Sequence, residues 1–382
     1  MKKIYDAAII GGGISGLSCA HELSKNNINF ILISPKLGGR MQTYGSNNMG
    51  ADYFCKLYHH IKPYVKKKGP LPVYTYNFWD GKGYSNYFNM RHWVQFSSVL
   101  KLYFILKKYV KELDNTITLA TQIGCTQSLL KNKFLLKLWN TSAIEFIQKN
   151  KLEKFENTYG RAIVNSTFFC KTEDLNAFHY LGNFIPLAVP SYEIDFKRTI
   201  EHLTKGYHAN ISYEKAVKIK KGKINTVFTN KSPYKTKNIV IAAPYNSMKK
   251  LFPELPKPDG MHSCFIHDVS GKLKKQFNKK KVIIFDPKKH PIGILWKQFD
   301  GSYIVSSYSE KPKLKDYFNS FKIKKTVHWN PAIIANKGNL ISERLSSNIF
   351  IASDYNISGL EISAINGLYA ANEIIKNTES KS

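Results

Sequence analysis

The stretch Ile4–Leu23, IYDAAIIGGGISGLSCAHEL, places a glycine cluster between an apolar run and a segment of helical character. It can be a secretory leader or a turn that holds a nucleotide. Asp6 interrupts what would be the apolar centre of a leader, and the glycines would weaken a leader helix. Gly16 also stands where a lipoprotein signal needs a bulky aliphatic residue before Cys19. We therefore favour the nucleotide turn.

The residues on either side of the glycines support this choice. Ala7–Ile10 is a short apolar run that predicts a strand. Leu17–Asn27 has helical character and ends in a turn-prone asparagine pair, and Ile28–Ser34 predicts a second strand. A glycine motif gains its meaning from a strand, turn, helix and strand in this order.

The glycines match the spacing G-x-G-x-x-G. Gly11 permits a tight turn, Gly13 lets the backbone approach a pyrophosphate, and Gly16 allows the helix to pack closely on the strand. Ile14 and Ser15 fall at the start of the helix, where free N–H groups and the positive end of the helix dipole face the phosphates. The stretch therefore predicts dinucleotide binding.

The second strand lacks the acid that usually binds the ribose hydroxyls of a dinucleotide. That acid is expected about 20 residues after the glycines, at the end of the second strand. Ser34 stands there instead. A hydroxyl can donate and accept, but it cannot provide the charge-assisted grip of a carboxylate. Ser34 is our predicted ribose partner.

A second glycine segment, Gly38-Gly39-Arg40-Met41-Gln42-Thr43, follows at once. With the first turn, it resembles the flavin amine oxidase, phytoene desaturase and protoporphyrinogen oxidase superfamily, whose FAD domain carries G-G-R-x-x-T. The resemblance implies that Gly38 and Gly39 let the chain pass close to the cofactor and that Arg40 neutralises phosphate charge. It also implies that the segment with Gly50 and Ala51 runs behind the flavin ring.

The C-terminal segment is similar to the closing FAD motif of the same superfamily. Ile349–Ala352 predicts a strand, and an acid, a glycine turn and a long helix follow it. The resemblance implies that Asp354 binds the ribityl chain. Gly359, Leu360 and Glu361 then begin a helix whose N-terminus points at the pyrimidine end of the flavin.

A weaker signal lies between these motifs. Ile211–Pro244 reads as a strand, a β-meander and the apolar strand Asn238–Pro244. In the superfamily a valine placed like Val217 meets the adenine through its backbone. The resemblance thus spans nearly the whole chain of 382 residues, in the family's order.

These motifs imply an α/β fold with a Rossmann-like FAD-binding domain that is discontinuous in sequence. We expect it to comprise residues 1–60, 195–250 and 340–382, and we expect residues 61–194 and 251–339 to form an inserted α+β substrate domain. The first insert is predicted to be mostly helical from residue 94 to 182. The second contains candidate strands at 280–287, 291–299 and 301–309, which suggest a sheet floor to a cavity.

The resemblance implies an FAD-dependent oxidoreductase that moves a hydride from a C–N or C–C bond of a small or lipid-like substrate to flavin N5. Trp329 and Tyr355 are candidates for the substrate side. We assign no catalytic residue, because an ordinary hydrogen-bonded histidine explains His262 and His267 better than a catalytic role does. No second complete G-x-G-x-x-G is present, so we expect oxygen, a quinone or another carrier to reoxidise the flavin.

Composition limits the partners and the compartment. The formal net charge is +30, but only five of the 57 basic residues are arginines, so we expect no nucleic-acid partner. The five cysteines are scattered without a C-x-x-C pair, which predicts neither disulfides nor a metal site. We expect a cytoplasmic protein. The lysine-rich segment Val99–Leu113 predicts an amphipathic helix that packs on the core, with peripheral membrane contact as the alternative.

Two other functions stay open. One is a redox-neutral flavin isomerase similar to UDP-galactopyranose mutase, which needs arginines that clamp a diphosphate. Arg91 and Arg161 are the arginines of the larger insert, and Arg198 lies just after it. The other is a catalytically degenerate, membrane-associated FAD protein.

Overall fold

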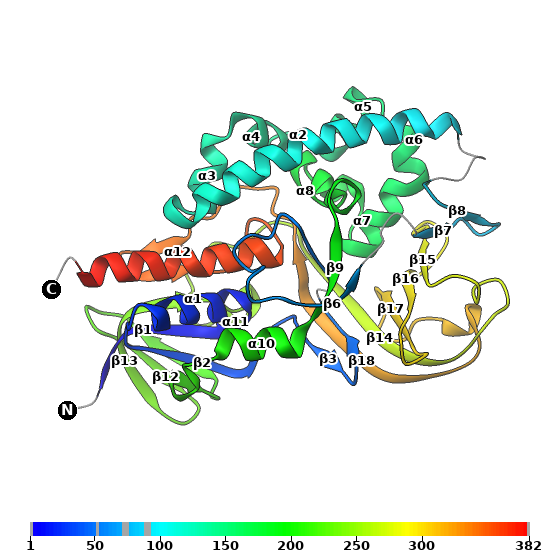
Figure 1. The fold of residues 1–382 in the computed structure, drawn as a ribbon. Helices are drawn as coiled ribbons and strands as arrows, with labels where there is room; N and C mark the ends of the chain where they lie inside the picture. Colours follow the sequence, from blue (N-terminus) through cyan, green and yellow to red (C-terminus); the bar gives the residue numbers. More distant parts are fainter. Residues whose placement is uncertain (1–2, 51–52, 71–75, 88–92, 380–382) are drawn as a thin grey trace.

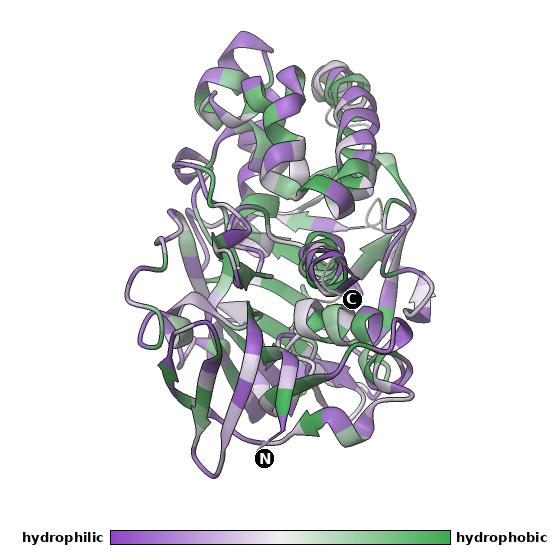
Figure 2. Ribbon diagram, turned by 90° about the vertical axis from the view of Figure 1, so that its left-hand side faces the viewer, coloured by the Kyte–Doolittle hydropathy of each residue, from purple (hydrophilic) through white to green (hydrophobic). Residues whose placement is uncertain are grey.

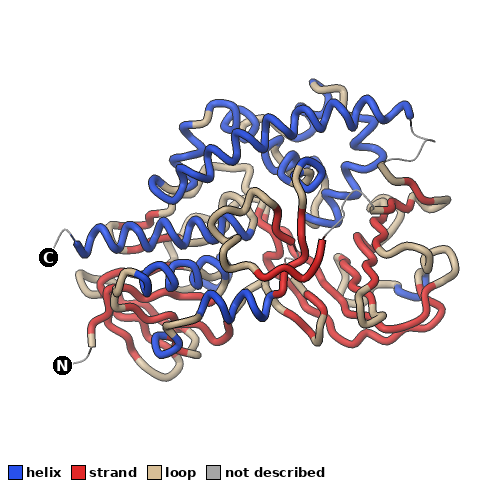
Figure 3. The backbone as a smooth tube through the Cα atoms, in the orientation of Figure 1, coloured by secondary structure: helices blue, strands red, loops and turns tan. Residues whose placement is uncertain are grey.

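The computed structural model describes residues 3–50, 53–70, 76–87 and 93–379. Two sheets form its floor, and a layer of helices lies over them (Figures 1 and 3). The first sheet has eight strands and the second has seven. Helices α1 and α12 lie on the first sheet, between it and the helical layer (Figure 1).

The opening stretch forms the centre of the first sheet, as expected for a turn that holds a nucleotide. Strand β1 (Ile4–Gly12) pairs in parallel with β2 (Phe30–Leu37) and with β13 (Pro233–Ile241). Helix α1 (Ile14–Lys25) connects β1 to β2. The predicted order of strand, turn, helix and strand is confirmed. Strand β1 is longer than the predicted Ala7–Ile10, because its sheet pairing continues at both ends.

The rest of the first sheet comes from distant parts of the chain. Its other strands are β10 (Ile211–Ser212), β11 (Ala216–Lys220), β12 (Asn225–Thr229), β19 (Arg344–Ser346) and β20 (Ile349–Ile351). Strands β11, β12 and β13 form the predicted meander. Strand β20 pairs in parallel with β13, which brings the C-terminal segment beside the N-terminal turn. A parallel sheet assembled in this way is Rossmann-like, as predicted.

The second sheet is mostly antiparallel. Its order is β18 (Phe318–Ile334), β14 (Met261–Leu273), β17 (Tyr303–Ser307), β16 (Ile292–Lys297), β15 (Val282–Phe285), β7 (Asn77–Trp79) and β8 (Tyr84–Ser85). The three candidate strands of the second insert are confirmed as β15, β16 and β17. The exact boundaries of the two domains stay a prediction.

Two small sheets connect the larger ones. Strands β3 (Thr43–Tyr44) and β4 (Asn47–Asn48) form a hairpin. Strand β9 (Ser191–Asp195) pairs with β5 (Tyr53–Cys55) and with β6 (Lys66–Pro70). These strands carry the chain from the first sheet toward the helical layer and back.

The first insert is helical, as predicted. It contains α2 (Trp93–Ile123), α3 (Cys125–Lys131), α4 (Lys133–Trp139), α5 (Ala143–Lys149), α6 (Glu153–Phe155), a π-helical turn (Glu156–Gly160), α7 (Arg161–Thr167), α8 (Ala177–Gly182) and α9 (Ile185–Ala188). In α2, Leu102, Leu106, Tyr109 and Leu113 are buried at helical spacing, so the segment Val99–Leu113 packs on the core as predicted. Within the described ranges, no helix is both long enough and apolar enough to cross a membrane.

Helix α12 (Leu360–Glu379) lies in the middle of the molecule (Figure 2). Its buried residues include Ala364, Ala370 and Ala371. A Cβ at Gly367 would lie 2.1 Å from the carbonyl oxygen of Ser15, so α12 packs directly on the first turn of α1. Helices α10 (Phe196–Thr204) and α11 (Tyr245–Met248) complete the layer around the first sheet.

Helix α3 is capped by a carboxylate from the far end of the chain. Its N-cap residue is Gly124, which has no side chain to accept from the first N–H groups. Glu343 accepts from the backbone N–H of Thr126 at 2.7 Å and from its Oγ1 at 2.9 Å. Burial raises the pKa of the Glu343 carboxyl above its ordinary 4.5, and the hydrogen bonds from Thr126 oppose that rise.

We expect this carboxyl to make the stability of the protein depend on pH. Because its pKa is higher in the folded chain than in the unfolded chain, raising the pH from below 4.5 removes a proton that the folded state holds more tightly. The free energy of unfolding should therefore fall until the folded-state pKa is passed. Glu343→Gln should reduce this fall, measured by urea unfolding at several pH values between 4 and 8. An equal fall in both proteins would contradict the assignment.

Candidate active site at the glycine turn

The turn between β1 and α1 is built so that the helix lies directly on the strand. A Cβ at Gly16 would stand 1.9 Å from the carbonyl oxygen of Gly11. Contacts between a real Cβ and an oxygen are never this short, so only glycine fits. Gly11 has φ +119°, in the region that favours glycine. These two residues therefore serve the turn itself.

Gly13 differs from Gly11 and Gly16, because no described side chain lies close to the position that its Cβ would take. A Cβ at Gly13 would meet only the Cα of Gly39, at 3.9 Å. Gly13 is also the N-cap of α1 and provides no side-chain acceptor for the first N–H groups of the helix. The first turn of α1 thus offers unpaired donors and a positive dipole end beside open space, which is the arrangement that binds anions.

The second glycine segment brings Arg40 to the C-terminal motif. A Cβ at Gly39 would lie 2.9 Å from the Cα of Gly13, so the two glycine segments touch. The Nη2 of Arg40 donates to Oδ2 of Asp354, and its Nη1 donates to the carbonyl oxygen of Ala332 at 2.6 Å. Two residues that are 314 positions apart therefore form an ion pair beside the glycine turn.

The acid of the C-terminal motif lies at the entrance to α12. Asp354 is 7% exposed, and Ser358 Oγ donates to it at 3.3 Å. Helix α12 begins at Leu360, and nothing lies within 4 Å of the position that a Cβ would take at Gly359. The N-termini of α1 and α12 therefore both lie near the Arg40–Asp354 pair.

Glu361 faces away from this pair. Its carboxylate accepts from the backbone N–H and Nδ1 of His60, both at 2.8 Å, and from the backbone N–H of Ile61 at 3.1 Å. It is 1% exposed. The side chain of Glu361 thus ties α12 to the segment after β5, and only its backbone lies at the start of the helix.

Trp329 lies next to the Arg40 segment. Its Nε1 donates to the carbonyl oxygen of Met49 at 2.6 Å. A Cβ at Gly50 would lie 1.7 Å from the carbonyl oxygen of Arg40 and 3.5 Å from Cζ2 of Trp329. The structure therefore brings together Arg40, Gly50 and Trp329, and the substrate-side role of Trp329 stays a prediction. Ala51 lies outside the described residues.

The structure does not bring Tyr355 to this place. Tyr355 is 2% exposed, its hydroxyl donates to the carbonyl oxygen of Ala243 at 3.0 Å, and its ring meets Tyr245 edge to face. It is a core residue between the first sheet and α11. A role for Tyr355 on the substrate side stays a prediction that its contacts do not favour.

Two further candidates, Ser34 and Val217, come from strands on opposite sides of β1 in the first sheet. Ser34 is buried beside Gly12, and its hydroxyl donates to the carbonyl oxygen of Lys36 at 2.7 Å. Val217 is 50% exposed on β11, where the pairing with β12 shifts between Ala216 and Lys218. Because of this bulge, Val217 has no partner in the pairing of β11 with β12, so its backbone groups are available to contact a ligand.

The surroundings of His267 and His262, the two histidines without an assigned role, lower the pKa of both side chains. His267 is fully buried, with its ring nitrogens 3.0 Å from Thr326 Oγ1 and from Ser307 Oγ, and burial lowers its pKa. Burial also lowers the pKa of His262. Over the described residues, no cluster of His, Cys, Asp and Glu is suited to a metal ion, and the five cysteines are free and buried.

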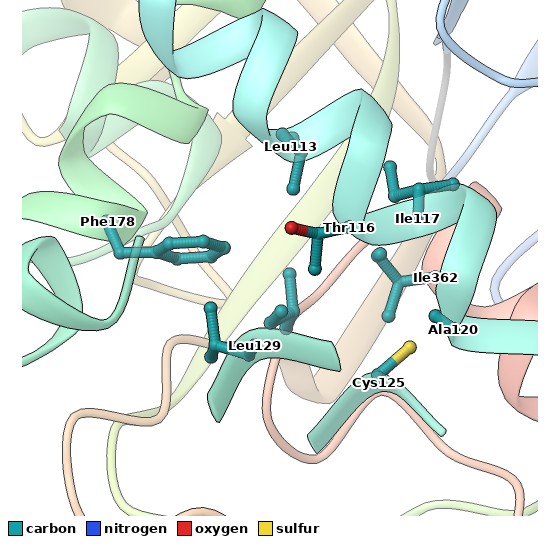
Figure 4. Close-up of a pocket in the computed structure, with 9 residues that line it drawn as sticks. Leu113, Thr116, Ile117, Ala120, Cys125, Leu129, Phe178 and Ile362 are labelled. Carbon is teal, nitrogen blue, oxygen red and sulfur yellow. The ribbon is translucent and has the colours of Figure 1, made fainter. Parts of the chain in front are cut away.

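A small apolar pocket lies beside the start of α12 (Figure 4). Its lining comes from α2, α3, α8 and the first turn of α12, and it consists of Leu113, Thr116, Ile117, Ala120, Cys125, Leu129, Phe178, Ile357 and Ile362. Thr116 is the only hydroxyl among these residues, and its Oγ1 donates to the carbonyl oxygen of Glu112. The pocket offers a ligand only apolar contact.

The sequence could not reveal the backbone partners in this site. The carbonyl groups of Met49 and Ala332 receive the Trp329 indole and the Arg40 guanidinium, but any residue type carries a carbonyl. A hydrogen bond to the carbonyl group of a residue far away in the sequence leaves no signal in a single sequence.

Comparisons with known proteins agree with this geometry. Residues 9–67 match the family model of an NAD(P)-binding Rossmann-like domain. No curated protein sequence matches the chain. Among solved structures, a double mutant of putrescine oxidase has a TM-score of 0.70 at 13% identity, covering 98% of this chain and 100% of its own.

Two other solved structures extend the comparison. Cyclohexylamine oxidase from Brevibacterium oxydans IH-35A has a TM-score of 0.64 at 12% identity, over 99% of this chain and 100% of its own. A fatty acid isomerase from P. acnes that produces CLA has a TM-score of 0.66 at 14% identity, over 96% of this chain and 98% of its own. The chain therefore shares its fold with these two amine oxidases and with the fatty acid isomerase, and residues 9–67 form its Rossmann-like unit.

Proposed function

We propose that the protein binds FAD and acts as an oxidoreductase on a C–N or C–C bond of a small or lipid-like substrate. The observation that carries this proposal is the Arg40–Asp354 pair beside two helix N-termini. An open glycine cradle, unpaired N–H groups and an arginine suit a dinucleotide diphosphate. FAD would supply the redox chemistry, and the chain would supply position and electrostatics.

Each part of the cofactor finds residues of suitable chemistry. Gly13, the first turn of α1 and Arg40 would hold the diphosphate, and Asp354 would accept from the hydroxyls of the ribityl chain. Ser34 and Val217 would lie toward the adenosine. The N-terminus of α12 would place positive potential beside the ring, and Trp329 would border the substrate. Oxygen, a quinone or another carrier would take the electrons.

The first experiment is the absorption spectrum of the purified protein. Bound FAD should give the two visible flavin bands, and adding FAD to colourless protein should restore them. Anaerobic bleaching by an amine, a polyene or a porphyrinogen would then identify the substrate class. A protein that neither carries nor takes up FAD would overturn the proposal, and it would leave a non-catalytic role.

A redox-neutral isomerase is the second candidate. It is favoured by the similarity of fold to the P. acnes fatty acid isomerase. The mutase type is less well supported, because the arginines that would clamp a diphosphate pair with carboxylates instead. Arg161 Nη2 is 3.1 Å from Asp286 Oδ2. Arg198 lies exposed on α10, with its Nε 3.6 Å from Asp195 Oδ2. Arg91 lies outside the described residues. An isomerase would convert substrate with no net consumption of an electron acceptor, whereas an oxidoreductase would consume one acceptor for each turnover.

The outer face of α2 supports peripheral membrane contact. Leu100 and Phe104 are 44% and 60% exposed, on the side of the helix opposite the buried stripe. Lys101, Lys107, Lys108 and Lys111 are exposed around them and form no ion pair within the described chain. Exposed apolar side chains ringed by lysines are typical of helices that bind anionic lipid surfaces.

We predict that the protein co-sediments with phosphatidylcholine vesicles that contain about a third phosphatidylserine. The double variant Phe104→Ser, Lys108→Glu should bind about tenfold more weakly, because it removes an apolar insertion and reverses a charge. Lys215→Glu, an exposed lysine on the first domain, is the matched control. Equal binding by all three proteins would show that the lysine content is compositional.

A further inference from the structure

Three side chains form a row across the second sheet, starting at Trp329. Cys264 on β14 is directly opposite Trp329 on β18. Ser307, the last residue of β17, is opposite Phe265, so Tyr308 follows beside Cys264. Cross-strand neighbours share one face of a sheet, so the row leads away from Trp329 along that face.

The helical layer covers this face through α7. A Cβ at Gly293 of β16 would lie 3.1 Å from the Cα of Ser166, so α7 lies against the sheet. Asn165 is the preceding residue of α7, and its Oδ1 accepts a hydrogen bond from the hydroxyl of Tyr308. The row thus ends where the sheet and the helical layer meet.

The amide of Asn165 is only half satisfied. Asn165 is 4% exposed, and its Nδ2 is buried without a hydrogen-bond partner among the described residues. An unpaired buried donor is unfavourable, and most buried polar groups have a hydrogen-bond partner. Tyr308, the hydrogen-bond partner of Asn165, is 49% exposed, so the pair lies at the border between the buried core and the surface. A ligand oxygen could provide the acceptor that Asn165 Nδ2 lacks.

We propose that Asn165 and Tyr308 bind an oxygen atom of the substrate, at the end farthest from the reacting bond. This inference rests on the proposed function, because it takes Trp329 as the border of the reacting end. Asn165 Nδ2 would donate to the oxygen, and Tyr308 would hold the amide in position. Neighbouring strands are about 4.8 Å apart, so Tyr308 lies about 10 Å from Trp329 along the sheet.

The surroundings of the pair favour a neutral oxygen over a carboxylate. Burial raises the pKa of the Cys264 thiol to about 12, so it carries no charge at neutral pH. Burial and the negative charge of Asp174 raise the pKa of Tyr308, so the phenol stays protonated. The Asn165 amide and the Tyr308 phenol are both uncharged, so a carboxylate buried against them would lack a compensating cation. An alcohol or a carbonyl on an otherwise apolar substrate fits this end of the row.

The test is a binding series that does not depend on turnover. ω-Amino alcohols with four, six, eight and ten carbons are compared with alkylamines of the same lengths, by thermal shift and by titration calorimetry. We expect the hydroxyl to improve affinity about tenfold for chains near eight carbons, which span about 10 Å, and to change little for four carbons. Asn165→Leu should abolish the gain, and Tyr308→Phe should reduce it.

The control variant is Asn157→Leu, which replaces an exposed asparagine one turn before α7 and should keep the gain. Circular dichroism and thermal unfolding of each variant check that it is folded. The proposal is overturned if the hydroxyl gives no gain at any length in the wild-type protein, or if the gain survives in Asn165→Leu. Since FAD content is measured separately, a protein that holds FAD but shows no gain would sink this inference and leave the proposed function intact.

Discussion

Replacing Gly13 by valine is expected to abolish FAD retention while leaving the apoprotein folded. Gly13 has φ −76° and ψ −178°, an extended conformation that valine adopts without strain. Among the described residues, the nearest atom that such a Cβ meets is the Cα of Gly39 at 3.9 Å, so these residues leave room for it. The added side chain would instead fill the space beside the first turn of α1. We expect an affinity loss of at least about 100-fold, or about 2.7 kcal/mol, in titrations with FAD.

Gly16→Ala is the matched comparison, with the opposite result. Its Cβ would collide with the carbonyl oxygen of Gly11 at 1.9 Å, and backbone atoms cannot move aside cheaply. We expect a loss of about 3 kcal/mol in the free energy of unfolding, measured by urea denaturation of the apoprotein. If Gly13→Val destabilised the apoprotein as much as Gly16→Ala, the open side of Gly13 would not be a ligand site.

The parts of the fold that sequence could predict are those with local signals. The alternation of apolar runs and glycine turns predicted β1, α1 and β2, because strand, turn and helix preferences act over a few residues. The apolar spacing of Val99–Leu113 predicted a helix that packs on the core, and Leu102, Leu106 and Tyr109 form its buried side. The approach of Arg40 to Asp354 followed from the resemblance to a family and had no local signal.

The direction of individual side chains was harder to predict. Tyr355 follows Asp354 directly, yet it packs into the core, because alternate residues after a strand face opposite sides. Glu361 begins α12, yet its carboxylate binds the segment at His60 and Ile61. Asn165 gave no signal at all, since an asparagine in a helix is usually exposed or structural. Tertiary packing decides the direction of all three side chains, and this packing cannot be predicted from a single sequence.

The Arg40–Asp354 pair should be the strongest coupling in the site, and a double-mutant cycle can measure it. Arg40→Ala leaves the carboxylate of Asp354 without its partner, and the side chain of Asp354 is 10% exposed. Removing one partner of a buried pair costs about 3–5 kcal/mol, and partial exposure of Arg40 reduces this to about 2–3 kcal/mol. Asp354→Ala should cost less, because Arg40 is 31% exposed and keeps its bond to Ala332.

The double variant Arg40→Ala, Asp354→Ala should therefore be less destabilised than the sum of the single variants, by about 1–2 kcal/mol in urea unfolding of the apoprotein. All three variants should also bind FAD at least about tenfold more weakly, because each removes either phosphate charge compensation or the ribityl acceptor. Additive effects on stability would mean that the two side chains are not coupled. Unchanged FAD affinity with a measured coupling would mean that the pair only joins the C-terminal motif to the glycine turn, because a cofactor that used either group would register its loss.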